Sequence, residues 1–105
     1  MKLWKDPFII SEIGINHNGI LSNAFKLIDS SVRAGASAVK FQTYKTEKRV
    51  KKNSSIFNIL KKCELSQEDF VKIKKYCDKK KIIFFSTPFD VESVFFFRVN
   101  WSKIV

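Results

Sequence analysis

Histidine and cysteine are nearly absent from the sequence, which has one histidine, His17, and two cysteines, Cys63 and Cys77. The cysteines lie in or beside predicted helices, without Cys-x-x-Cys spacing and without a histidine nearby to complete a metal site. We therefore interpret both as reduced thiols, with Cys77 in the core, and we expect no metal ligands from this chain.

Long apolar runs are also missing. The longest, such as Ile82–Phe85 and Val94–Phe97, are far shorter than the roughly 20 residues that cross a bilayer as a helix. The first seven residues lack the apolar core of a signal peptide. The sequence thus predicts a cytoplasmic protein without a membrane partner.

Acidic residues are few, with 10 Asp and Glu against 20 Lys and Arg, and the net charge is +10. Such an excess raises the question of nucleic acid, whose phosphates attract basic proteins of any sequence. The lysines are spread along the polar faces of predicted helices and through the loop Lys45–Lys52, and no nucleic-acid-binding motif is present. We expect a solvated basic surface, compatible with an anionic small substrate, and no nucleic-acid partner.

Apolar residues make up 45% of the 105 residues, which is enough for one small domain with a modest core. Their spacing predicts strands over Phe8–Ile13, Ala36–Gln42 and Ile82–Phe85. It predicts helices over Ser22–Ala34, with Ser22 as cap and Gly35 as the residue that ends the helix, and over a segment opened by Ser66 with Phe70, Ile73 and Cys77 on its buried face.

Strands that alternate with helices are typical of βαβ units and a parallel sheet. Gly14 and Gly19 do not form the Gly-x-Gly-x-x-Gly spacing of a dinucleotide site. In the barrel version of this architecture the working residues sit at the carboxyl ends of the strands, where Glu12, Lys40, Gln42 and Thr87 fall.

The segment after the first strand holds Asn16, His17 and Asn18 between two glycines. One interpretation is a solvated turn in which the asparagines satisfy their own backbone, because Asn and Gly are ordinary turn residues. The other is a site, because Glu12 at the end of a buried strand is costly unless it is paired or acts on a ligand. Polar groups at three separate strand ends favour the site.

Three blocks resemble the sialic acid synthase (N-acetylneuraminate synthase) family: Ile10–Gly19 (ISEIGINHNG), Ala34–Thr43 (AGASAVKFQT) and Phe85–Asp90 (FSTPFD). The resemblance implies a (β/α)8 TIM barrel that condenses phosphoenolpyruvate with an N-acetylated hexosamine to give a nine-carbon keto-sugar acid. It also implies a divalent metal, Mn or Mg, and a homodimer. The 105 residues would form the N-terminal portion of the barrel, about three βα units, without its C-terminal half or the small antifreeze-like domain that usually follows.

By position, the resemblance makes Lys40 the phosphoenolpyruvate-binding lysine and Thr87 a hydroxyl donor to the same ligand. Glu12 and Gln42 correspond to residues that act on or orient the sugar, with Glu12 as a general acid or base. Asn16, His17 and Asn18 are expected to line the substrate pocket.

The sequence also departs from the family pattern. No histidine follows His17, so the family's metal ligands are absent, and Lys81 replaces a glycine that usually follows the second helix. Beyond Val94 the similarity fades, and Lys103 is predicted to begin a fourth strand and to contact phosphate.

Several functions stay open at this point. The chain resembles a sialic, legionaminic or pseudaminic acid synthase, or another phosphoenolpyruvate-dependent aldol synthase. A fragment of an open barrel has unpaired sheet edges and uncovered apolar faces. The remaining alternative is therefore a non-catalytic remnant that only self-associates, and we expect the chain alone to be inactive.

Overall fold

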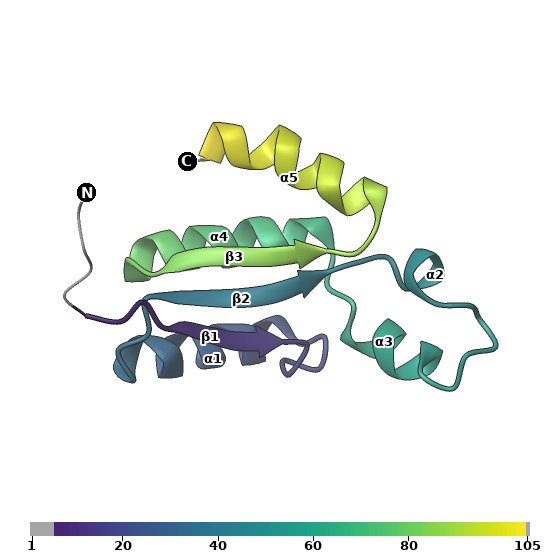
Figure 1. Ribbon diagram of the computed structural model, residues 1–105, viewed down its shortest axis with the longest axis horizontal. Coiled ribbons are helices and arrows are strands. Elements are labelled where there is room, and N and C mark those ends of the chain that lie inside the picture. Colours follow the sequence, from purple (N-terminus) through teal and green to yellow (C-terminus); the bar gives the residue numbers. More distant parts are fainter. Residues whose placement is uncertain (1–5, 105) are drawn as a thin grey trace.

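The computed structural model describes the backbone of residues 6–104 and the side chains of residues 6–100. Strands and helices alternate along most of the chain (Figure 1). In chain order the elements are β1 (Ile10–Gly14), α1 (Leu21–Arg33), β2 (Ala38–Thr43), α2 (Thr46–Arg49), α3 (Phe57–Cys63), α4 (Gln67–Lys80), β3 (Ile83–Pro88) and α5 (Val91–Ile104).

The three strands form one parallel sheet in the order β1-β2-β3, as the alternating pattern predicts. Helices α1 and α4 lie side by side behind the sheet, and α2 and α3 lie beyond the carboxyl ends of the strands (Figure 1). Because α1 and α4 both lie behind the sheet, one face of the sheet is covered and the other is open. The predicted α/β class and incomplete barrel are confirmed.

The covered face holds the core. Val39 and Phe41 of β2 are fully buried, and the Phe41 ring stacks on Phe84 at 5.6 Å and meets the edge of Phe70 at 6.3 Å. Phe70, Ile73 and Cys77 of α4 are buried, as their helical spacing predicts. Burial raises the pKa of the Cys77 thiol to about 12, which keeps that core thiol protonated.

The ends of α1 and α4 follow simple rules with one exception. Gly35, at φ +86°, ends α1, and the Ser66 hydroxyl accepts the Asp69 N–H at the start of α4. Lys81, which replaces a glycine, takes the left-handed conformation at the end of α4, with φ 60°. Ser22 is not the cap of α1: the helix begins at Leu21, where the preceding loop turns tightly enough for the Ile20 N–H to reach the His17 carbonyl.

The predicted fourth strand is wrong. Residues 91–104 form a single helix, α5, whose backbone includes Lys103. Asp90 accepts the Ser93 N–H and so caps the helix, and Phe96 and Phe97 pack toward the core cluster. The side chain of Lys103 lies outside the described residues, and its backbone follows α5 rather than the sheet.

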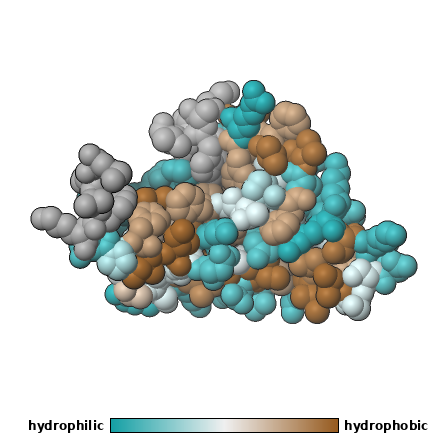
Figure 2. All heavy atoms as spheres, viewed as in Figure 1, coloured by the Kyte–Doolittle hydropathy of each residue, from teal (hydrophilic) through white to brown (hydrophobic). Residues whose placement is uncertain are grey.

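The open face carries exposed apolar side chains from β1, from β3 and from the segment before β1. We call Phe8, Ile10, Ile83 and Phe85 the open-face patch; Ile10 is 44% exposed and Ile83 is 49% exposed. Figure 2 shows hydrophobic residues gathered over this face, toward the end where the strands begin. In the described part of the chain, β1 and β3 each pair with β2 alone, so two strand edges are also free.

Candidate functional site

The register of the sheet brings Glu12 and Lys40 together on the open face. They are direct neighbours across β1 and β2, and the distance from Lys40 Nζ to Glu12 Oε2 is 3.8 Å. The Lys40 side chain is 41% exposed and that of Glu12 is 55% exposed. An ion pair this exposed contributes little stability, so the cation can exchange its partner for an anionic ligand at low cost.

Gln42 lies near this pair, beside Gly14. Gly14 lies at an irregularity in β1, with φ +58°, a conformation that glycine adopts without strain. A Cβ atom at Gly14 would lie 3.5 Å from Gln42 Nε2 and 3.6 Å from Glu12 Oε1. The amide and the carboxylate therefore both lie beside Gly14, where the backbone carries no side chain.

Thr87 lies next to Gln42 in the register of β2 and β3, and its side chain is half-buried. Because paired residues of parallel strands point to the same side, Thr87 shares the open face with Lys40 and Gln42. We call Glu12, Lys40, Gln42 and Thr87 the strand-end cluster. The sequence predicted all four, and the structure places them on one face.

The other predicted residues lie in the loop after β1, where the two asparagines are exposed and His17 is buried. Asn16 and Asn18 are exposed, but the Asn16 side chain donates to the Ile13 carbonyl at 3.0 Å, and Asn18 takes φ 57°. The Asn16 side chain thus bonds within the turn, and Asn18 supplies its left-handed residue, while the predicted contact of both with substrate stays a prediction. Gly19 packs against α3, where a Cβ atom would lie 2.0 Å from the Lys62 carbonyl oxygen.

His17 does not join the strand-end cluster. It has no exposed surface, and its ring stacks on Phe41, which lies on the helix-covered face of β2. Nδ1 accepts the Gly19 N–H at 2.9 Å, so the proton of the neutral ring sits on Nε2, which has no hydrogen-bond partner among the described residues. In this conformation His17 holds the loop and offers no atom to a ligand.

This burial predicts a pH-dependent stability. Burial lowers the pKa of His17 below its ordinary value of 6.5, and the carboxylate of Asp69 opposes that shift only in part. The unfolded chain therefore binds a proton more readily, and the free energy of unfolding should decrease as the pH falls below 6.5. Urea unfolding at pH 7.5 and 5.5 should show this loss, and His17→Gln should remove it; an equal loss in both proteins would contradict the assignment.

Arg49 of α2 is a neighbour of the cluster that the sequence analysis missed. Its Nη1 donates to Gln42 Oε1 at 3.0 Å, and its guanidinium carbon lies 3.8 Å from the centre of the Phe89 ring. The sequence put this residue in a charged, irregular loop, where it is the one arginine among lysines. No motif or periodicity in the surrounding sequence indicated that Arg49 contacts Gln42.

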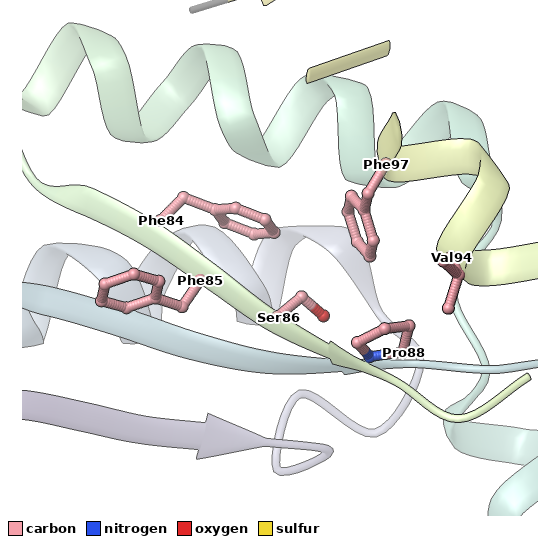
Figure 3. Close-up of a pocket in the computed structure, with 6 residues that line it drawn as sticks. All are labelled: Phe84, Phe85, Ser86, Pro88, Val94 and Phe97. Carbon is pink, nitrogen blue, oxygen red and sulfur yellow. The ribbon is translucent and has the colours of Figure 1, made fainter. Parts of the chain in front are cut away.

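A separate cavity of about 290 Å³ lies between β3 and α5 (Figure 3). Its lining is apolar except for the hydroxyl of Ser86, and it contains none of the four cluster residues. Its walls are formed by Phe84, Phe85, Ser86, Pro88, Val94 and Phe97. It is a packing gap at the free edge of β3 and lacks the charged groups that a sugar or phosphate would need.

The described residues do not hold a group of three His, Cys, Asp or Glu side chains able to bind a metal ion. The metal implied by the family resemblance therefore does not fit this part of the chain.

Within residues 6–104, no helix is long and apolar enough to span a bilayer.

The parallel sheet, its helix-covered back and its polar strand ends are those of the N-terminal part of a TIM barrel. The solved structure of N-acetylneuraminic acid (sialic acid) synthetase from Leptospira borgpetersenii serovar Hardjo-bovis, in complex with citrate, matches with a TM-score of 0.84 at 40% identity. The match covers 90% of this chain and 33% of that one. The chain belongs to the NeuB family, whose sequence model matches residues 27–104.

Two other relatives agree with this placement. The structure of the spore coat polysaccharide biosynthesis protein spsE from Bacillus subtilis matches with a TM-score of 0.71 at 39% identity, over 93% of this chain and 28% of that one. The N,N'-diacetyllegionaminic acid synthase of Legionella pneumophila is 38% identical over 85% of this chain and 29% of its own length. The chain thus spans about a third or less of the relatives it matches.

Proposed function

We propose that this chain supplies part of the substrate site of a synthase that condenses phosphoenolpyruvate with an N-acetylated hexosamine to give a nine-carbon keto-sugar acid. The observation that carries the proposal is the strand-end cluster, a cation, a carboxylate and an amide converging on the open face of the sheet in a chain of the NeuB family. Active sites of TIM barrels lie at this end of the strands.

Each side chain has a role that its chemistry allows. Lys40 binds the phosphate or carboxylate of phosphoenolpyruvate as a compact positive charge, with the hydroxyl of Thr87 as a further donor. Gln42 and Glu12 face the sugar. As C3 of phosphoenolpyruvate attacks the aldehyde carbon of the open-chain sugar, Glu12 acts as general acid or base or binds a sugar hydroxyl. We derive no step through the metal, because the described residues do not hold it.

The same site chemistry suits more than one product. Legionaminic or pseudaminic acid synthesis remains an alternative, as does another phosphoenolpyruvate-dependent aldol condensation, since these differ in the sugar rather than in the anion. For the whole protein we propose a cytoplasmic enzyme that forms a homodimer. Residues 1–105 would form the partial TIM-barrel domain within it.

The test is a chimera in which this chain replaces the matching segment of the Leptospira synthetase. We expect phosphate release that requires both phosphoenolpyruvate and an N-acetylated hexosamine, with the keto-sugar acid identified by mass spectrometry. A panel of N-acetylmannosamine and diacetylated hexosamines separates the sialic, legionaminic and pseudaminic alternatives. A chimera that folds as a native-like barrel but forms no product with any of these sugars would contradict the proposal.

In this chimera we expect Lys40→Ala to raise the KM for phosphoenolpyruvate by about 10- to 150-fold and to change the KM for the sugar much less. The reason is the loss of a charge-assisted contact, which contributes about 1.5–3 kcal/mol. Lys45→Ala, which removes a cation outside the open face, is the matched control. Equal changes in both KM values would count against the role of Lys40.

A second candidate function is association without catalysis, favoured by the open-face patch and the two free strand edges. We expect the isolated chain to be inactive and to form oligomers in size-exclusion chromatography with light scattering. Ile83→Lys, which puts a charge on the patch, should shift it toward monomer. Ile59→Lys, at an isoleucine on α3 that is somewhat more exposed, should not. A sharp monomer peak for the unchanged chain would contradict this prediction.

A further inference from the structure

We infer that Arg49 is a positioning residue that fixes the side-chain amide of Gln42, so that Gln42 meets the substrate as a hydrogen-bond donor. This inference rests on the proposed function and concerns the same site. Arg49 lies on α2, outside the sheet, and reaches the strand-end cluster only through Gln42.

The contact decides which way the amide points. A glutamine amide has one oxygen acceptor and an NH2 donor, and the two ends are nearly identical in shape. The guanidinium has only donors, so it selects the oxygen, Oε1, at 3.0 Å. Nε2 is then turned toward Gly14 and Glu12, and a flipped amide would set NH2 against the guanidinium.

The guanidinium is itself held in place. It lies over the Phe89 ring at 3.8 Å and over the Tyr44 ring at 4.8 Å, both within the range of cation–π attraction. Tyr44 is buried and donates its hydroxyl to the Leu60 carbonyl at 2.6 Å, and the Phe89 N–H bonds to the Thr43 carbonyl at 3.0 Å. Arg49 is therefore set by the fold before any ligand arrives.

As a result, the N–H donor of Gln42 and the carboxylate acceptor of Glu12 lie on the same side of Gly14. Gln42 Nε2 and Glu12 Oε1 lie near one point above Gly14, so a ligand group placed there meets an N–H and a carboxylate together. A sugar hydroxyl, or the amide of an N-acetyl group, can accept from the first and donate to the second. A lysine at position 49 keeps the charge but lacks the planar fork that stacks on the two rings.

The first experiment uses the chain itself. It contains two glutamines, Gln42 and Gln67, so selective 15N labelling of glutamine side chains gives two NH2 signals, assigned with Gln67→Ala. We expect the chemical shifts of the Gln42 NH2 pair to differ from those of free glutamine, and its hydrogens to exchange slowly. Arg49→Met should move these shifts to the values of free glutamine and leave the shifts of Gln67 unchanged. Lys48→Met removes a neighbouring exposed charge and should leave both pairs in place.

The second experiment measures kinetics in the chimera. Arg49→Met should raise the KM for the amino sugar by about 5- to 20-fold and leave the KM for phosphoenolpyruvate unchanged, with partial recovery in Arg49→Lys. An unchanged Gln42 signal, or equal effects on both KM values, would overturn the inference. An inactive chimera with a normal Arg49-dependent Gln42 signal would instead contradict the proposed function and leave the positioning role supported.

Discussion

Glu12→Gln is expected to lower the kcat of the chimera by about 10²- to 10⁴-fold, which is the usual contribution of a positioned general acid or base. Glutamine keeps the shape of the side chain and one acceptor oxygen, but it cannot exchange a proton at the reacting group. It also removes the charge that Lys40 Nζ faces at 3.8 Å. The KM for phosphoenolpyruvate should therefore stay the same or decrease slightly, because the cation is left free for the anion.

The measurement is steady-state kinetics with both substrates varied. Glu68→Gln, an exposed carboxylate on α4, is the matched control and should leave kcat unchanged. If Glu12→Gln keeps the turnover of the parent chimera, Glu12 is a structural residue of β1, and the acid–base role is wrong.

Phe41→Ala is expected to destabilise the chain by about 3–5 kcal/mol, which is typical of a buried phenylalanine replaced by alanine. The ring is fully buried and contacts three other segments: it stacks on His17 of the loop after β1 and on Phe84 of β3, and it meets the edge of Phe70 of α4. Its loss opens a cavity at the centre of the covered face and removes the support of the loop after β1.

Urea unfolding at one fixed protein concentration measures this effect. Phe95→Ala makes the same chemical change at a side chain that is 55% exposed, and it should alter the free energy of unfolding by less than about 0.5 kcal/mol. Similar losses for the two variants would mean that Phe41 does not organise the core.

Much of the fold follows from local chemistry that can be read in the sequence. Lys40 and Gln42 alternate with Phe41 along β2, so the period of a strand puts them on the other face of the sheet. The cap at Ser66 follows from one hydroxyl and one N–H. Lys81 stands where glycine is usual, which left a left-handed lysine or a different turn open, and the structure has the left-handed lysine. These features depend on a few neighbouring residues, so spacing and residue type were sufficient.

The features that sequence missed depend on contacts between distant segments. Arg49 meets Phe89 across 40 positions and Gln42 across a loop, and no periodicity records either contact. His17 is polar and follows a strand, as a site residue would, but it is buried because Phe41 offers a ring to stack on. The aromatic run in α5 has no polar face, so its period could not distinguish helix from strand.

The central claim is that the open face at the carboxyl ends of β1, β2 and β3 binds both substrates. The most direct measurement is a crystal structure of the chimera with phosphoenolpyruvate and the sugar alcohol of the hexosamine, which lacks the reactive aldehyde. We expect an anionic oxygen of phosphoenolpyruvate within hydrogen-bond distance of Lys40 Nζ, and the sugar analogue between Glu12 and Gln42 Nε2. Both ligands bound elsewhere, with Lys40 still paired to Glu12, would contradict it.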